Sequence, residues 1–80
     1  MITVQGIVVP SQWDEQGNVL AVGISMANER ELLVLNDAPG RKLFRYIRQT
    51  VEVCGTLRKN METGLKDAIK VRNFRLTSEP

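Results

Sequence analysis

The residues of this 80-residue chain that suit ligand chemistry are its cations and a tryptophan, because histidine is absent and cysteine occurs once. Histidine is the commonest general base near neutral pH and the commonest metal ligand. Its absence excludes Ser-His and Cys-His nucleophilic pairs and the usual zinc sites. The sequence also contains no phosphate-binding glycine loop of the Gly-x-Gly-x-x-Gly or Gly-Lys-Ser/Thr type. We therefore expect a protein that is not an enzyme and that holds no metal and no cofactor.

Positive charge is concentrated in the second half of the chain. Residues 41–75 hold ten of the eleven basic residues against three acids, whereas residues 1–40 hold one arginine against five acids. A basic surface attracts phosphate groups and gives sequence-independent affinity by releasing counterions. The second half of the chain therefore predicts an interface for single-stranded DNA or RNA.

Trp13 and a group of cations are the candidates for this interface. Trp13 falls in a predicted hairpin loop, where an exposed indole stacks on an unpaired base and contributes about 1–3 kcal/mol. The cations lie on or beside a second predicted hairpin and are Arg58, Lys59, Lys66, Lys70 and Arg72. Two alternatives stay open: the indole folds back over the protein, or the cations serve solubility alone. A helical stripe of Arg41, Arg45 and Arg48 is expected to face water.

Five strand-like runs and one amphipathic helix must position these side chains. Asp37 is expected to cap the helix, which has Pro39 in its first turn and ends near Gln49 after about ten residues. A glycine in the middle of the first strand, Gly6, predicts a bend that lets this strand serve two sheets. A bulge near Asn73 is needed for the last strand to keep Ile69, Val71, Phe74 and Leu76 inside. The strands are expected over residues 2–9, 19–26, 31–36, 50–58 and 66–76.

The order of these elements resembles that of the OB-fold family, as do the two glycine-centred strands Val4-Gln5-Gly6-Ile7-Val8 and Val53-Cys54-Gly55-Thr56-Leu57. The resemblance covers residues 2–76. It implies an all-β protein, a closed five-stranded β-barrel with one short helix between the third and fourth strands. An SH3-like barrel is the alternative. We expect residues 1–80 to form a single domain with a frayed tail over residues 77–80.

Ligands of the OB-fold usually lie across its second and third strands, and the resemblance places this face at residues 19–26 and 31–36. Both runs are aliphatic in both phases, and they hold no aromatic residue. A strand that faces water on one side should alternate, so this pattern predicts a covered outer face. The alternative function is therefore a protein-interaction or self-association module, whose partner is another protein or a second copy. Its candidate residues are Leu20, Val22, Ile24, Leu33 and Leu35.

No membrane segment is expected, since the longest unbroken apolar stretch, residues 19–24, is far shorter than the roughly 20 residues that a spanning helix needs. The N-terminus lacks the basic start and the long apolar region of a signal peptide. The single cysteine, Cys54, agrees with a reducing compartment. We therefore expect a cytoplasmic protein.

Overall fold

The computed structural model describes residues 1–27, 29–59 and 66–77, and its elements follow the order that the sequence predicts. The helical segment begins as an α-helix and continues as a 3₁₀-helix. In chain order the elements are β1 (Ile2–Trp13), β2 (Val19–Ser25), β3 (Glu31–Val34), α1 (Ala38–Arg41), η1 (Lys42–Tyr46), β4 (Thr50–Arg58) and β5 (Ala68–Leu76).

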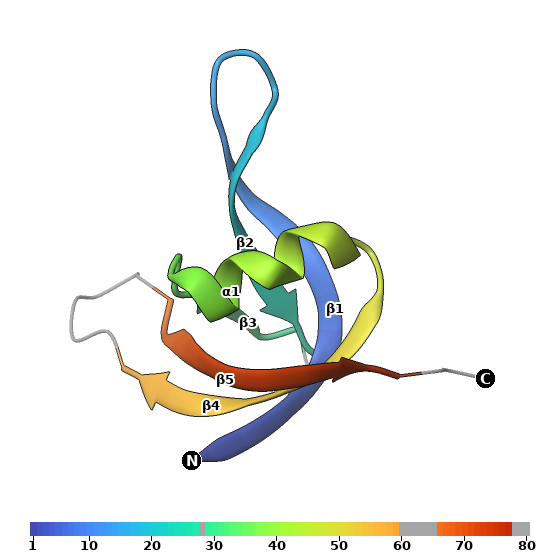
Figure 1. Cartoon of the computed structure of the whole chain (residues 1–80), viewed down its shortest axis with the longest axis vertical. Helices are drawn as coiled ribbons and strands as arrows, with labels where there is room; N and C mark the ends of the chain where they lie inside the picture. The colour runs from blue at the N-terminus through green and yellow to red at the C-terminus, as the bar shows by residue number, and fades with distance from the viewer. Residues whose placement is uncertain (28, 60–65, 78–80) are drawn as a thin grey trace.

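The five strands close into a barrel in the spatial order β1-β2-β3-β5-β4 (Figure 1). Neighbouring strands are antiparallel except β3 and β5, which run parallel where the barrel closes. The first half of β1 pairs with β4 and its second half pairs with β2, with Ile7 common to both ladders. The predicted all-β fold with one short helical segment is therefore confirmed.

Two glycines allow close contacts between strands that a side chain would prevent. A Cβ atom at Gly6 would overlap the carbonyl oxygen of Ser25, at the point where β1 passes from β4 to β2. A Cβ atom at Gly55 would overlap the carbonyl oxygen of Lys70. The predicted bend at Gly6 therefore marks the place where one strand serves two ladders.

The predicted bulge in the last strand lies beside Gly55. Cys54 pairs with Asn73 and Gly55 pairs with Val71, so Arg72 is an extra residue in β5. This single insertion changes the phase of the strand, as expected. We call it the β5 bulge.

The barrel interior is filled by aliphatic side chains from every strand, and burial alternates along β4, with Val51 and Val53 fully buried. Leu43 of η1 is also fully buried, so it anchors the helical segment to the core. The remaining core residues among those described are Val8, Val22, Ile24, Leu32, Val34, Ile69 and Val71.

β1 is longer than predicted, because it continues past Pro10 to Trp13. Proline was expected to end the strand, but β1 pairs with β4 only as far as Ile7. Beyond Ile7, β1 has a neighbouring strand on one side only. A proline, which lacks an N–H group, is therefore tolerated there, because that group would have no strand to bond on the other side. Residues 10–22, which we call the ribbon, form a two-stranded hairpin that projects from the barrel (Figure 1).

The helical segment has about the predicted length, but it ends at Tyr46 rather than near Gln49. Its start agrees with the sequence, since the Asp37 carboxylate accepts a hydrogen bond from the Gly40 N–H at 3.0 Å. Its end is set by β1: Val8 accepts a hydrogen bond from the Arg48 N–H at 2.7 Å and donates one to Gln49 at 3.1 Å. Arg48 takes a φ of 73°, so it does not continue the predicted stripe of Arg41 and Arg45.

Smaller differences occur at the ends of strands. β3 ends at Val34 and β5 begins at Ala68, each two residues inside its predicted range. Phe74 is half-buried as part of the core shell, but Leu76, which was expected inside, is 47% exposed because it occupies the last pair of the β4–β5 ladder. In the predicted tail, Thr77 still donates to Thr50, and residues 78–80 lie outside the described part of the chain.

We predict that Gly55→Ala lowers the free energy of unfolding by about 3 kcal/mol, because the new methyl group meets backbone rather than a movable side chain. Gly17→Ala is the matched control, since Gly17 has open space around it but a φ of 86°. It should cost about 1 kcal/mol through backbone strain alone. Urea unfolding followed by circular dichroism measures both, and equal losses would contradict the assigned cause.

We also predict that Arg48→Asn raises the free energy of unfolding by about 0.5–1 kcal/mol, because asparagine tolerates a positive φ better than arginine. Arg45→Asn makes the same chemical change within η1 and should instead lower stability by about 0.5 kcal/mol. Thermal unfolding of the two variants tests the opposite signs. A loss of stability in both would show that the strain at Arg48 is not relieved by asparagine.

Candidate nucleic-acid interface

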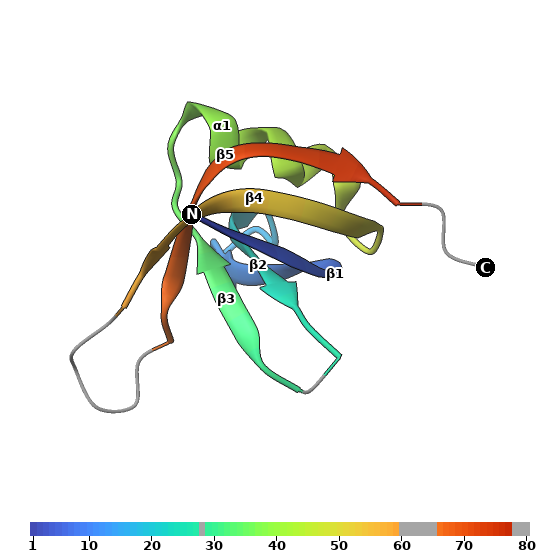
Figure 2. The ribbon, with the colours of Figure 1, turned by 90° about the horizontal axis from the view of Figure 1, so that it is seen from below.

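Three cationic residues, one from the helical segment and two from β5, border the hollows beside the β5 bulge. Lys70 lies in the outward phase of β5, opposite Thr56 of β4, and Arg72 is the bulged residue itself. Lys42 begins η1, directly after α1, which lies beside β5 (Figure 2). We call the surface formed by Lys42, Lys70 and Arg72 the β5 basic surface.

Two adjoining hollows make this surface concave. One is about 190 Å³ and reaches from Lys42 to Asn73 and Phe74, and the other is about 380 Å³ and reaches Thr56 and Lys70. They share Pro39, Val71 and Arg72, so they lie on either side of the bulge. No acidic residue lines either hollow among the described residues.

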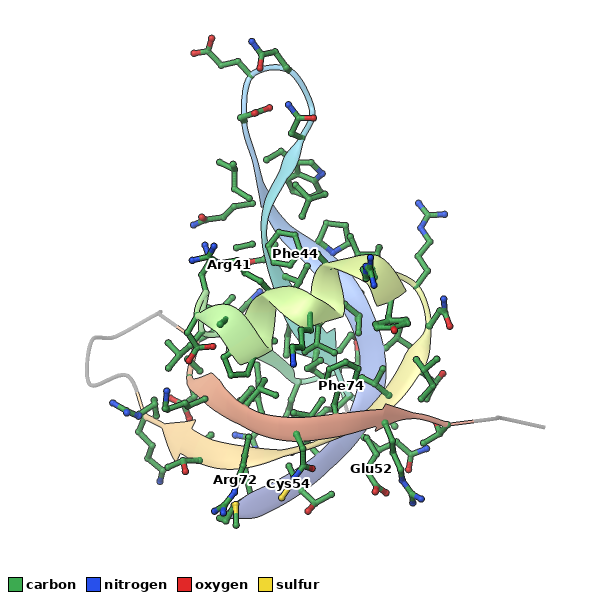
Figure 3. All side chains as sticks on the ribbon, in the orientation of Figure 1. Arg41, Phe44, Glu52, Cys54, Arg72 and Phe74 are labelled. Atoms are coloured by element: carbon green, nitrogen blue, oxygen red, sulfur yellow. The ribbon has the colours of Figure 1, made fainter. Side chains whose placement is uncertain are left out.

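The three cations of this surface differ in whether another side chain already pairs with them. The Lys70 ammonium lies 3.0 Å from the Asp37 carboxylate and remains half-exposed, whereas Lys42 makes no ion pair within the described part of the chain. The Arg72 guanidinium points away from the helical segment (Figure 3) and donates to the Met1 sulfur at 3.9 Å. This contact is weak, so the guanidinium stays available to a stronger acceptor.

Asp37 links the helical segment to β5 by its charge. The hydrogen bond from the Gly40 N–H and then the bond from Lys70 hold the pKa of its carboxyl below the ordinary value of 3.8. The carboxylate is therefore ionised at neutral pH. It caps α1 and positions Lys70 at the edge of the β5 basic surface.

The other predicted cations lie nearer the end of the β4–β5 hairpin. Arg58 and Lys59 are exposed and form no ion pair with any described residue. Lys66 lies 2.8 Å from the Glu31 carboxylate and borders a different hollow, of about 460 Å³, at the mouth of the barrel. The loop over residues 60–65 lies outside the described residues. Arg58 and Lys59 thus extend the β5 basic surface along its strands, whereas Lys66 is engaged elsewhere.

Trp13 is 56% exposed, so its indole does not fold back into the core. Trp13 is the last residue of β1 and lies on the ribbon, which projects from the barrel (Figure 1). Trp13 and the candidate cations of β4 and β5 therefore lie on different elements of the barrel. The aromatic residue that borders the β5 basic surface is Phe74, whose ring meets Tyr46 edge-on with centroids 5.6 Å apart.

The alternative interface on β2 and β3 needs correction. Val22 and Ile24 are 1% and 0% exposed and belong to the core, so their predicted position on an outer face is wrong. The residues of β2 that alternate with Val22 and Ile24 are Ala21, Gly23 and Ser25. Their side chains are small, so the outer side of β2 is not the aliphatic face that was predicted. Leu33 and Leu35 are half-buried, and only Leu20 of the five candidates is strongly exposed.

Lys42 is the residue that sequence analysis missed. Its neighbours Arg41 and Arg45 were assigned to a helical stripe, but nothing local in the sequence places Lys42 against β5. That placement depends on Leu43, which is buried in the core and fixes the rotation of the segment.

Comparison with protein-family models, with curated proteins and with solved structures finds no match to this chain. Within the described ranges, no helix is long and apolar enough to cross a membrane. No group of three or more Asp, Glu, Cys or His side chains gathers to hold a metal ion in the same ranges.

We predict that acid weakens the fold through Asp37. A carboxyl whose pKa is lowered by folding stabilises the protein above its unfolded pKa, and this contribution is lost as the pH falls through the folded value. The urea midpoint of the wild type should therefore fall between about pH 4 and pH 2. Asp37→Asn keeps a capping side chain but does not titrate, so its midpoint should fall less over this range. An unchanged acid response in this variant would contradict the role of Asp37.

Proposed function

We propose that this chain is a non-enzymatic binding module of the OB-fold type that binds single-stranded DNA or RNA across the β5 basic surface. The observation that carries the proposal is the pair of hollows around the β5 bulge, lined by Lys42, Lys70 and Arg72 and by no described acidic residue. The closed barrel and its element order support the family assignment.

The arrangement suits a sugar-phosphate backbone better than a single small anion. The three cations come from two elements, η1 and β5, and the Arg72 guanidinium points away from the helical segment (Figure 3), so their charges are spread apart and suit successive phosphates rather than one. Neutralising phosphates with Lys and Arg releases counterions, which is the main source of affinity that does not depend on sequence. Arg58 and Lys59 extend the positive surface toward the end of the hairpin.

Base recognition on this surface is limited to stacking and hydrogen bonds from small polar groups. Phe74 offers part of an aromatic ring, and Thr56 and Asn73 offer hydrogen-bond donors and acceptors. Stacking on an aromatic ring does not distinguish strongly between bases. The expected activity is therefore binding of single strands with little sequence preference.

We predict that fluorescein-labelled oligothymidylate and oligouridylate bind at low salt with a rise in anisotropy that weakens as salt increases. Three phosphate contacts correspond to a slope of log affinity against log salt of about −2, since each contact contributes about −0.7 on a single strand. The two oligonucleotides distinguish DNA from RNA. Emission of Trp13 should stay unchanged, because the indole lies on the ribbon.

Arg72→Gln and Lys42→Gln should each weaken binding and reduce the steepness of the salt dependence by about 0.7. Arg30→Gln removes the same charge at the barrel mouth and is the matched control, which should keep the wild-type slope. Absence of binding at low salt would overturn the proposed function. An effect of Arg30→Gln equal to that of Arg72→Gln would overturn its placement on β5.

A further inference from the structure

The ribbon carries large apolar side chains that are exposed and do not belong to the barrel core. Trp13 is 56% exposed and Leu20 is 47% exposed. Trp13 pairs with Val19 and Gln12 pairs with Ala21, so Leu20 is the extra residue of a bulge in β2. A bulge turns a side chain out of the regular ladder, and here it directs a leucine to solvent. The exposure of Leu20 is thus built into the backbone.

The tip of the ribbon is ordered by its own hydrogen bonds. The Asp14 carboxylate accepts bonds from the backbone N–H groups of Gln16 and Asn18, both at 2.9 Å, and from the Asn18 side chain at 3.0 Å. The side-chain bond from Asn18 is the main cause that lowers the pKa of Asp14. The tip is therefore a rigid, negatively charged end on an apolar stem, a preorganised surface that loses little entropy on docking.

The charge of the ribbon argues against nucleic acid as its partner. It contains Asp14 and Glu15, and no Lys or Arg occurs anywhere between Met1 and Glu29. Phosphates would meet net repulsion there, whatever the indole gained by stacking. The partner must offer apolar surface together with positive charge.

A second copy of the chain offers both. The helical segment from Ala38 to Tyr46 holds Arg41, Lys42 and Arg45 and no acid. Arg41 points toward the side from which the ribbon projects (Figure 3), and it makes no ion pair with the described residues. Two ribbons packed antiparallel place the tip of each beside the base of the other. In a dimer with a two-fold axis, the two ribbons share one apolar contact, and the contact between an acidic tip and an Arg41 occurs twice.

We propose that two copies of this chain associate about a two-fold axis by packing their ribbons antiparallel through Trp13 and Leu20, with the acidic tip of each ribbon against Arg41 of the other copy. The surface is separate from the β5 basic surface, because Lys42 faces β5 whereas its neighbour Arg41 faces the ribbon side. The contact is small, so the dimer is weak and depends on concentration.

Sedimentation equilibrium at low salt, from about 10 μM to 1 mM, tests this association. The wild type should pass from monomer to dimer over this range. Leu20→Lys should weaken dimerisation about tenfold or more, because it puts a charge in place of a leucine that each copy would bury in the dimer. Leu76→Lys is the matched control, since Leu76 is also 47% exposed, and it should change dimerisation less than about twofold. Circular dichroism confirms that both variants fold.

A charge exchange tests the antiparallel arrangement. Glu15→Arg and Arg41→Glu should each weaken the dimer about fivefold, because each creates two repulsive contacts, and the double variant should return to within about twofold of the wild type.

The proposal would be overturned by a wild type that stays monomeric throughout, by equal effects of Leu20→Lys and Leu76→Lys, or by additive weakening in the double variant. Quenching of Trp13 emission when oligothymidylate is added to the monomer would assign the ribbon to nucleic acid and would also overturn it.

Discussion

The close contact between Gly6 of β1 and the carbonyl oxygen of Ser25 is the constraint on which the rest of the barrel depends. Only a residue without a side chain lets β1 bend there, leave β4 and continue beside β2. Without that bend, β1 would serve one ladder and the barrel would have open edges. The barrel and the ribbon therefore have a common origin, since the ribbon is the part of β1 and β2 that continues past the point where β4 separates.

The same strand also determines the helical segment. Val8 exchanges hydrogen bonds with Arg48 and Gln49, which stops the helix early and forces Arg48 into a left-handed conformation. Its end is held by these bonds and Leu43 is buried in the core, so the rotation of the segment about its own axis is fixed relative to β5. This rotation directs Lys42 to the β5 bulge and Arg41 to the ribbon side. A backbone contact on β1 thus separates two basic side chains that are neighbours in the sequence.

Local patterns predicted the element order, the bend at Gly6, the cap at Asp37 and the bulge in β5, because each follows from the chemistry of a few adjacent residues. They did not predict the length of β1, since Pro10 ends a strand only where the missing N–H group would be used. They also gave the wrong outer face for Val22 and Ile24, because an aliphatic run in both phases does not reveal its own register. The candidate surface around β5 was predicted only in part, because Lys42 joins it through tertiary packing.

The sequence separates an acidic first half from a basic second half, but ion pairs in the fold neutralise part of this separation. Lys66, Lys70 and Arg75 from the basic half pair with Glu31, Asp37 and Glu52, and two of these three acids come from the acidic half. Exposed pairs of this kind add little stability, but they reduce the positive charge that faces solvent on β5. Lys42 and Arg72 keep theirs, and both adjoin the bulge. Asp14 and Glu15 meet no cation along the ribbon, so the fold leaves charge of opposite sign on two separate surfaces, and charges of this kind favour partners of different chemistry.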